Sequence, residues 1–543
     1  MKEDIKKLLS ESVLQAKKAQ GWDDFDVPEI IVDYAKNEQF GDYSSNVAMI
    51  LAGKIGKNPL EIAEAIKLQI TNYKLQNFEK VEVAAPGYIN FYLSKKYLQN
   101  IALKINKEKN DFGNLEIGKN IKVNNEFISA NPTGPLHLGN GRGGFYGDCL
   151  SKILRKAGFD VTNEYFINDA GEQVLKLGHS VLKDSEAVYA GEYIDELNKK
   201  YATISDVREV GTKAAKDILE NIIQKTAKEK MQINFDEWIS EKSLQDEKYI
   251  DRAIEFLKEK KLTYESEEAF WLKTTEFGDD KDRVLIKSDG QKTYFATDCG
   301  YILNKKERDF DKIIEIWGAD HHGYINRFQA AAEALGFQKE QIKFIIVQLV
   351  RLVKDGKEVR MSKRAGNVVY IDDLIEEIGH DVTRFFFLMY CPDTHMNFDL
   401  GLAKEQSQKN PVFYVQYAHA RICSILKKAE DTIIKKPASP TDKQETKNAD
   451  LSLLTHEKEL SLIRELNKFP EIIEEISESY EVHKLPHYAL KLADKFHSFY
   501  DTCRVVDEEN IELSKARLTL TNAARIVLAE TLKLVGVSAP EKM

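Results

Sequence analysis

The chain has 543 residues, of which 43% are hydrophobic and 31% charged, and its net charge is −10. This length predicts a soluble globular protein of two to four domains, and the charge excludes a coat for nucleic acid while permitting RNA contacts through local basic patches. No apolar run approaches membrane-spanning length, and the five cysteines are scattered and never form a CxxC pair. We therefore expect a cytoplasmic protein without membrane association, disulfide framework or protein-bound zinc.

The N-terminal part, residues 1–108, mixes helix and strand signals. Residues 1–20 place apolar side chains at helical spacing among lysines and acids, which is typical of an amphipathic helix and not of a targeting peptide. EIIVDYA (29–35) predicts a strand, NPLEIAEAIKLQI (58–70) a helix, and VEVAAPGYINFYL (81–93) a strand, a turn and a second strand. We expect a small α/β domain.

Short apolar strands alternate with helical stretches over residues 109–375. IKVNNEFISA (121–130), DKIIEIWGAD (311–320) and IKFIIVQLV (342–350) are the clearest strands. Such alternation predicts a parallel sheet with crossover helices, which is a Rossmann-like core. Charged helical material between about 175 and 290 interrupts the alternation, as expected of an insertion between two half-sheets.

Residues 376–405 are predicted to connect this core to a C-terminal domain, residues 406–543. No glycine occurs between Gly401 and Gly536, and the apolar spacing there is helical throughout. The C-terminal domain is therefore predicted to be an all-α bundle.

The stretch HLGNGRGG (137–144) fits two interpretations. Its glycines, Gly139, Gly141 and Gly144, spell the GxGxxG of a dinucleotide-binding turn. In that turn the first glycine directly follows a strand, whereas here the proline-containing NPTGPLHL intervenes. The alternative is that His137 at a helix start binds a triphosphate, and that the glycines let the nucleotide approach closely.

A second basic stretch favours the triphosphate interpretation. GKEVRMSKRAGN (356–367) follows a strand and, taken alone, is equally consistent with a solvated charged turn. Paired with the proline-spaced HLGN more than two hundred residues upstream, it resembles the HIGH and KMSKS signatures of class I aminoacyl-tRNA synthetases. HLGN at 137–140 matches the first signature and RMSKR at 360–364 the second.

The surrounding sequence is similar to the arginyl-tRNA synthetase family of bacterial type along nearly the whole chain. The segments that carry this resemblance are GDYSSNVA, APGYINFYL, NEFISANPTGPLHLGNGRGGFYGD, YFINDAGEQ, TYFATDCGY, WGADHHGYINR, KRAGNVV, NPVFYVQYAHARI and the last 28 residues from ARLTLTNAARI onward. The resemblance implies a tRNA-contacting N-terminal domain, a Rossmann-like catalytic core and an anticodon-binding C-terminal bundle. It also implies ATP with Mg²⁺, L-arginine and tRNA(Arg) as ligands.

The resemblance assigns the ATP site to the two signatures and to WGAD. His137 would donate to the phosphates, and Lys363 would neutralise the α-phosphate and pyrophosphate oxygens. Asn140 stands where the family's second histidine would be, and its amide can still donate a hydrogen bond. The remaining ATP-binding positions implied are Gly139, Gly318, Asp320, Met361 and Ser362.

The resemblance assigns arginine recognition to acids that fit a planar cation. Glu126, Asp298 and Tyr294 would contact the guanidinium, which presents five donors and a permanent charge. Asn131, Asn168 and Asp169 match positions near the substrate backbone, and His321 would line the pocket. A metal site at His321 and His322 is not expected, because adjacent side chains of an extended segment point apart.

The tRNA contacts and two rival functions remain open at this stage. Tyr414, Tyr417 and His419 could stack on anticodon-loop bases, although such a helical stripe is more often core. A nucleotidyltransferase of related fold is disfavoured by the acids suited to a guanidinium. A degenerate synthetase kept as an RNA-binding scaffold is disfavoured by the retained His137 and Lys363. A monomer is expected.

Overall fold

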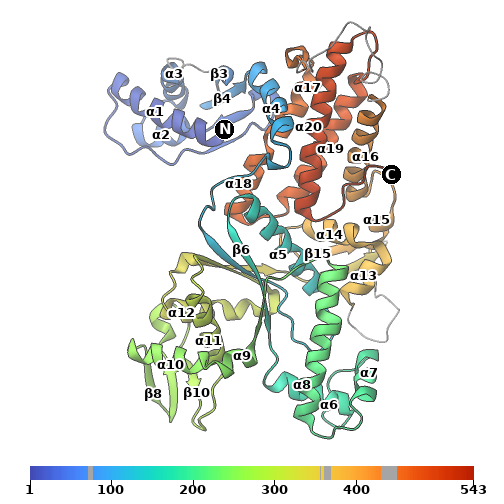
Figure 1. Ribbon diagram of the computed structural model, residues 1–543. Helices are drawn as coiled ribbons and strands as arrows, with labels where there is room; N and C mark the ends of the chain where they lie inside the picture. The colour runs from blue at the N-terminus through green and yellow to red at the C-terminus, as the bar shows by residue number, and fades with distance from the viewer. Residues whose placement is uncertain (71–76, 355, 360–368, 430–448) are drawn as a thin grey trace.

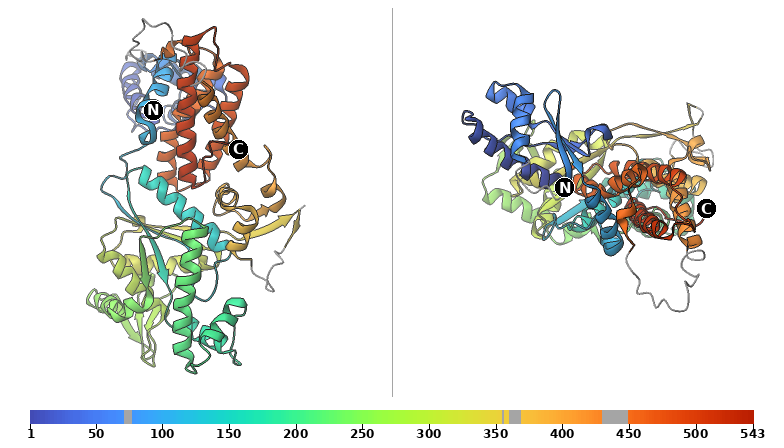
Figure 2. Two further views of the ribbon diagram at one scale, coloured as in Figure 1. Left: turned by 45° about the vertical axis from the view of Figure 1, so that its right-hand side comes forward. Right: turned by 90° about the horizontal axis from the view of Figure 1, so that it is seen from above.

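The computed structural model describes residues 1–70, 77–354, 356–359, 369–429 and 449–543 (Figure 1). The N-terminal domain and a long helical bundle lie side by side at one end of the molecule, and the central parallel sheet lies toward the other end (Figure 1, Figure 2). Among the described residues, no helix combines the length and apolar character needed to cross a membrane. This arrangement confirms the predicted fold class.

The N-terminal domain is an antiparallel sheet of order β1-β2-β4-β3 covered by helices. The predicted amphipathic helix is present, and its residues Ile5, Leu9 and Val13 are fully buried. The elements are α1 (Lys2–Gln20), β1 (Val32–Tyr34), β2 (Tyr43–Ser45), α2 (Val47–Ile55), α3 (Pro59–Ile70), β3 (Phe78–Ala84), β4 (Tyr88–Leu93) and α4 (Lys95–Glu108).

The core is a five-stranded parallel sheet of order β12-β11-β5-β6-β7. From β5 the chain runs outward through β6 to β7, and later returns to the other side of β5 as β11 and then β12. The direction of winding therefore reverses between β5 and β11. The core elements are β5 (Lys122–Glu126), α5 (Leu138–Lys156), β6 (Asp160–Ile167), β7 (Glu237–Ser240), α11 (Tyr294–Glu307), β11 (Lys312–Gly318), α12 (Ile325–Ala334) and β12 (Ile342–Val347).

The range 175–290 is not purely helical, which corrects the expectation from its charged stretches. It contains β7, which completes the central sheet, and a separate antiparallel sheet of order β10-β9-β8. These strands have only four residues each and little alternation, so their pattern is weak. The remaining elements here are α6 (Glu172–Leu182), α7 (Glu192–Lys200), α8 (Val207–Ile218), α9 (Glu241–Asp246), α10 (Tyr249–Glu259), β8 (Thr263–Ser266), β9 (Ala269–Leu272) and β10 (Arg283–Ile286).

A small sheet and two helices lead from β12 to the bundle. The sheet has the order β14-β13-β15, and the connecting elements are β13 (Val350–Lys354), β14 (Lys357–Glu358), α13 (Ile371–Ile378), α14 (His380–Leu388), β15 (Met396–Asp399) and α15 (Leu400–Lys404). The bundle consists of α16 (Pro411–Ala429), α17 (Glu457–Asn467), α18 (Phe469–Ser479), α19 (Lys484–Thr502) and α20 (Ile511–Val535), as predicted.

Helix α5 spans the distance from the central sheet to the bundle (Figure 1). Near its middle the Tyr146 hydroxyl donates to the Tyr480 carbonyl in the α18–α19 turn. At its end the ammonium of Lys156 lies 3.1 Å from the carboxylate of Glu530 in α20, and both side chains are buried. One helix therefore contacts both parts of the molecule.

Candidate functional site

The predicted site residues gather where the winding of the sheet reverses. In open α/β sheets, ligands bind in the crevice at the carboxyl ends of the two strands that flank this reversal. Here those ends are Glu126 of β5 and Gly318 of β11. Residues 127–137 connect β5 to α5, so the first glycine of GxGxxG does not follow the strand directly, which excludes the dinucleotide turn.

His137 and Asn140 cap the start of α5 by reciprocal hydrogen bonds. His137 Nδ1 accepts from the backbone N–H groups of Gly139 and Asn140, at 3.1 and 3.4 Å, and Asn140 Oδ1 accepts from the His137 backbone N–H at 3.1 Å. Because Nδ1 is an acceptor, the proton of the neutral ring resides on Nε2. Burial lowers the pKa of His137, against the opposing charge of Asp320, which favours this neutral donor form.

Two of the three glycines serve packing and not a nucleotide, which corrects the sequence-based expectation. A Cβ at Gly141 would lie 2.5 Å from Ile371 Cδ1, and one at Gly144 would lie 2.7 Å from Ile128 Cδ1. Both contacts are far inside van der Waals distance, so these positions require glycine for helix α5 to pack. A Cβ at Gly139 would lie 3.0 Å from His137 Cε1 and 3.1 Å from His137 Nδ1, so the absence of a side chain there leaves room for the His137 ring.

The segment after RMSKR lies against the HLGN segment. His137 and Tyr370 form an isolated antiparallel bridge. Backbone hydrogen bonds of 3.2 and 2.9 Å flank it between residues 136–138 and 369–371. Residues 369–371, which follow the second signature in the chain, are thus adjacent to the first signature. Three predicted ATP-site residues lie outside the described part of the chain: Met361, Ser362 and Lys363.

The turn after β11 carries the predicted WGAD residues. It is a short 3₁₀ helix, η6 (Ala319–Tyr324), that begins directly after Gly318. The side chains of Asp320 and His321 are 81% and 60% exposed, and His321 Nε2 lies 3.4 Å from Asp320 Oδ2. The Asp320 charge reaches His137 across the crevice. These polar groups are therefore available to a ligand at the α5 start.

One face of α11 carries a line of polar residues toward the sheet. Tyr294, Asp298, Tyr301 and Lys305 are spaced by four, three and four residues, which places them on the same side of the helix. Asp298 accepts a 2.7 Å hydrogen bond from the Tyr324 hydroxyl, and burial raises the pKa of Asp298 to about 7. Tyr294 is 59% exposed, and its hydroxyl lies beside Gly171.

The predicted residues near the substrate backbone are partly engaged with each other. Asn168 Nδ2 donates to Asn131 Oδ1 at 2.7 Å. Asp169 accepts from the Ser240 hydroxyl at 2.7 Å and from the Lys242 backbone N–H at 3.0 Å, so it holds the start of α9. The structure therefore brings Asn131 and Asn168 together, and it gives Asp169 a local structural contact.

Glu126 belongs to a buried ionic cluster that the sequence reasoning missed. The chain turns sharply after it with positive φ at Ile128 and Ser129, 69° and 37°. This turn returns the Ser129 hydroxyl to Glu126 Oε1 at 2.9 Å. The other carboxylate oxygen contacts Tyr301 and Lys305 at 2.6 and 2.7 Å. The sequence pattern that could have indicated this cluster is a polar residue at every third or fourth position of the buried helix α11.

The three candidate tRNA-stacking residues differ in accessibility. His419 is 3% exposed, and its Nδ1 lies 2.9 Å from the Pro540 carbonyl oxygen, so stacking by His419 is excluded in this conformation. Tyr414 is half-buried, with its ring 5.1 Å from that of His497. Tyr417 lines a surface hollow together with Arg421 and the last two residues. Tyr414 and Tyr417 are both half-buried, and only Tyr417 of the three lines this hollow.

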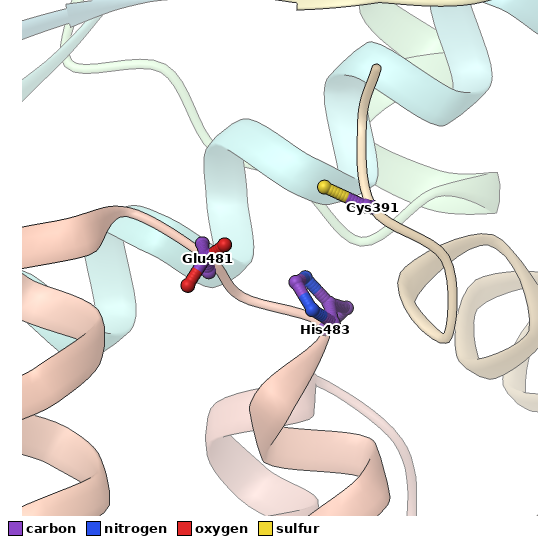
Figure 3. Close-up of side chains that lie close together, drawn as sticks. All are labelled: Cys391, Glu481 and His483. Atoms are coloured by element: carbon purple, nitrogen blue, oxygen red, sulfur yellow. The ribbon is translucent and has the colours of Figure 1, made fainter. Parts of the chain in front are cut away.

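A cluster with metal-ligating atoms lies away from the crevice (Figure 3). Cys391 approaches Glu481 and His483 from a facing loop, and one ligand atom of each lies within 4.8 Å of the others. However, Lys484 Nζ already lies 2.5 Å from the Glu481 carboxylate, and the start of α19 carries partial positive charge. Both features disfavour a bound cation, so we assign this cluster no metal.

Comparisons with known proteins agree with this architecture. The model of the class I (R) tRNA synthetase catalytic domain matches residues 190–385. The arginyl tRNA synthetase N-terminal domain matches residues 1–93, and the DALR anticodon binding domain matches residues 415–543. A parallel sheet whose winding reverses beside a HIGH-like helix start, in a chain that matches these three domains, defines a class I aminoacyl-tRNA synthetase.

Full-length relatives identify the family within that class. The arginine–tRNA ligase of Listeria monocytogenes serotype 4a is 43% identical over 572 residues, covering 100% of both chains. That of Bacillus subtilis strain 168 is 43% identical over 563 residues, covering 100% of this chain and 99% of the other. The chain belongs to the arginyl-tRNA synthetase family. The Thermus thermophilus arginyl-tRNA synthetase structure shares the fold, with a TM-score of 0.77, 22% identity, and coverage of 99% and 100%.

Proposed function

We propose that the protein is an arginine–tRNA ligase. In the first step the arginine carboxylate attacks the α-phosphate of ATP, which gives arginyl-adenylate and pyrophosphate. In the second step a ribose hydroxyl at the 3′ end of tRNA(Arg) takes the arginyl group. No protein nucleophile is required, so catalysis rests on alignment and on donors aimed at the phosphates.

The observation that carries the proposal is the meeting of two chemically distinct half-sites at one crevice. On one side lies the start of α5, where His137 and backbone amides favour an anion. On the other side lies the α11 face, where Asp298 is a half-buried carboxyl beside the buried Glu126. A triphosphate fits the first half-site and a cationic side chain fits the second. Full-length identity of 43% to arginine–tRNA ligases supports the same assignment.

His137 would act through Nε2. Its Nδ1 is held by backbone donors, so Nε2–H points away from the cap as a neutral hydrogen-bond donor for ATP phosphate oxygens. Gly139, which has no side chain beside the His137 ring, would leave the nucleotide room to approach the start of α5. Lys363 would add positive charge from the neighbouring signature, and Gly318 with Asp320 would hold the ribose. Mg²⁺ would be carried by the ATP phosphates, because phosphate oxygens are ligands that this ion prefers.

Asp298, Glu126 and Tyr294 would hold the guanidinium, with Asn131 and His321 nearer the α-amino and carboxylate groups. Tyr414 and Tyr417 would contact the anticodon loop. We further propose a monomer in the cytoplasm.

The test is arginine-dependent exchange of pyrophosphate into ATP, run with and without tRNA(Arg), followed by charging of that tRNA. We expect exchange with arginine and none with lysine. Absence of exchange in both conditions, together with retained tRNA binding, would instead favour an RNA-binding scaffold. Exchange that depends on a substrate other than an amino acid would favour a nucleotidyltransferase.

A further inference from the structure

Three glutamates stand side by side across three parallel strands of the central sheet. Glu126 of β5 pairs in register with Glu315 of β11 on one side and with Glu164 of β6 on the other. Residues in register on parallel strands project from the same face of the sheet. All three side chains are buried, with residue exposures of 5%, 1% and 0%. Adjacent like charges repel strongly in such a site.

Two cations cover this row, Lys305 of α11 and Arg308 directly after the end of that helix. Lys305, which is fully buried, places Nζ 2.7 Å from Glu126, 2.6 Å from Glu315 and 3.5 Å from Glu164. Arg308 contacts Glu164 at 2.5 Å. The cluster therefore holds three carboxyl groups and two permanent positive charges, which leaves one negative charge in excess when every carboxyl is ionised.

The contacts of Tyr301 indicate where that excess charge goes. Its hydroxyl lies 2.6 Å from Glu126 and 2.5 Å from Glu164. A hydroxyl has one proton and can donate to only one of two carboxylates. At this distance, the second contact needs a proton as well, and that proton must be carried by the other glutamate as a neutral carboxyl group. The geometry therefore accommodates one additional proton in the cluster.

We propose that this cluster, with Glu315 as a positioning residue, is a charge-balancing device for arginine recognition that exchanges one proton for the substrate guanidinium. Without arginine, one proton neutralises the excess charge. When arginine binds at Glu126, its guanidinium supplies the missing positive charge, and the proton leaves to solvent. This inference rests on the proposed function, because it places the guanidinium at Glu126.

The groups that face the cluster come from every element packed against it. They are Glu126 of β5, Glu164 of β6, Glu315 of β11, the exposed Glu237 of β7, Asp298, Tyr301 and Lys305 of α11, and Arg308 directly after that helix. Glu237 is screened by water, so its charge does not enter the charge balance of the buried cluster. Asp298 lies beside the cluster and could also release a proton when arginine binds. The test therefore uses a variant that leaves Asp298 in place, so that any difference from the wild type comes from the cluster.

The charge balance also bears on specificity. Citrulline has nearly the shape of arginine but no charge, so it cannot replace the proton, and the cluster would stay protonated and gain no ion pair with the ligand at Glu126. We expect discrimination against citrulline to depend on the excess charge as well as on the direct guanidinium contacts.

The experiment compares the wild-type protein with Glu315→Gln, which removes one carboxylate that the substrate does not touch. Arginine binding is measured by titration calorimetry at pH 6.5 in two buffers of different ionisation enthalpy, which counts released protons. We expect the variant to release about one proton fewer per arginine. In tRNA charging, the variant's KM for arginine should exceed the wild-type value by about tenfold at pH 8 and by less at pH 6, while KM for ATP stays unchanged.

Two further variants separate this role from a purely structural one. Glu315→Asp retains the charge and should restore the proton release and the pH profile. Glu530→Gln removes another buried carboxylate paired to a lysine, 3.1 Å from Lys156, and should lower thermal stability without changing proton release. Equal proton release and parallel pH profiles in wild type and Glu315→Gln would overturn the inference. Failure of the wild type to charge tRNA with arginine would overturn the proposed function itself.

Discussion

Replacing Asp298 with Asn separates arginine recognition from stability. In the wild type, the Tyr324 hydroxyl donates to Asp298 Oδ2 at 2.7 Å. Asparagine keeps an oxygen that can accept this hydrogen bond, so the local packing is retained. It removes the charge that would pair with the guanidinium. Loss of one partner of a buried charge pair costs about 2–5 kcal/mol, so KM for arginine should rise at least about 30-fold while KM for ATP stays constant.

The same substitution should stabilise the arginine-free protein. Burial raises the pKa of Asp298 from 3.8 to about 7, so the unfolded carboxyl ionises at much lower pH than the folded one. The ionised group therefore destabilises the fold by an amount that grows from pH 4 to pH 7 and is constant above. A shift of about three units corresponds to about 4 kcal/mol at pH 8, and to about 1.6 kcal/mol at pH 5.

Two measurements check this reasoning. Urea unfolding of both proteins at pH 5 and pH 8 should give a larger free energy of unfolding for the variant, with the greater gain at pH 8. Steady-state charging should show the loss confined to arginine. A variant that is no more stable than wild type at pH 8, or that loses ATP and arginine affinity equally, would refute the assigned environment of Asp298.

Three further predictions concern the α5 glycines, the second signature and the bundle. Gly141→Ala should lower thermal stability and activation together, because its Cβ would overlap a neighbour at 2.5 Å, whereas Gly143→Ala, with nothing within 4 Å, should be tolerated in both assays. Lys363→Ala should slow pyrophosphate exchange by about 10²–10³ with an unchanged melting temperature, and wild-type exchange would refute its role. Tyr417→Ala should raise KM for tRNA without affecting exchange, whereas His419→Ala should mainly reduce stability; the reverse pattern would contradict the assigned surface.

The sequence predicted those parts of the site in which a short motif is compatible with only one local structure. HLGN after a proline-containing connection could open a helix but could not form a dinucleotide turn, and the structure agrees. Asp298 was named only through the resemblance of TYFATDCGY to the family, because an isolated acid in a sequence is more often a surface or capping residue. The reason for Gly141 and Gly144 was not predictable, because the side chains they accommodate come from distant segments.

The missed features depend on pairings between strands. Glu126, Glu164 and Glu315 are separate acids in the sequence, and only the strand order places them in one row. The four-residue strand β7 carries no pattern that distinguishes it from a loop, and its place in the sheet depends on β6. His419 was misjudged because its burial depends on the last residues of the chain folding back over α16.

Helix α5 connects the His137 cap rigidly to the C-terminal bundle. Its 19 residues begin at the His137 cap and end beside α20, so its length is about 28 Å. A tilt of about 2° at the bundle end would displace the His137 end by about 1 Å, which is enough to change a reaction rate about a hundredfold. A small reorientation of the bundle would therefore move His137 relative to the ATP phosphates by a distance that matters for the reaction.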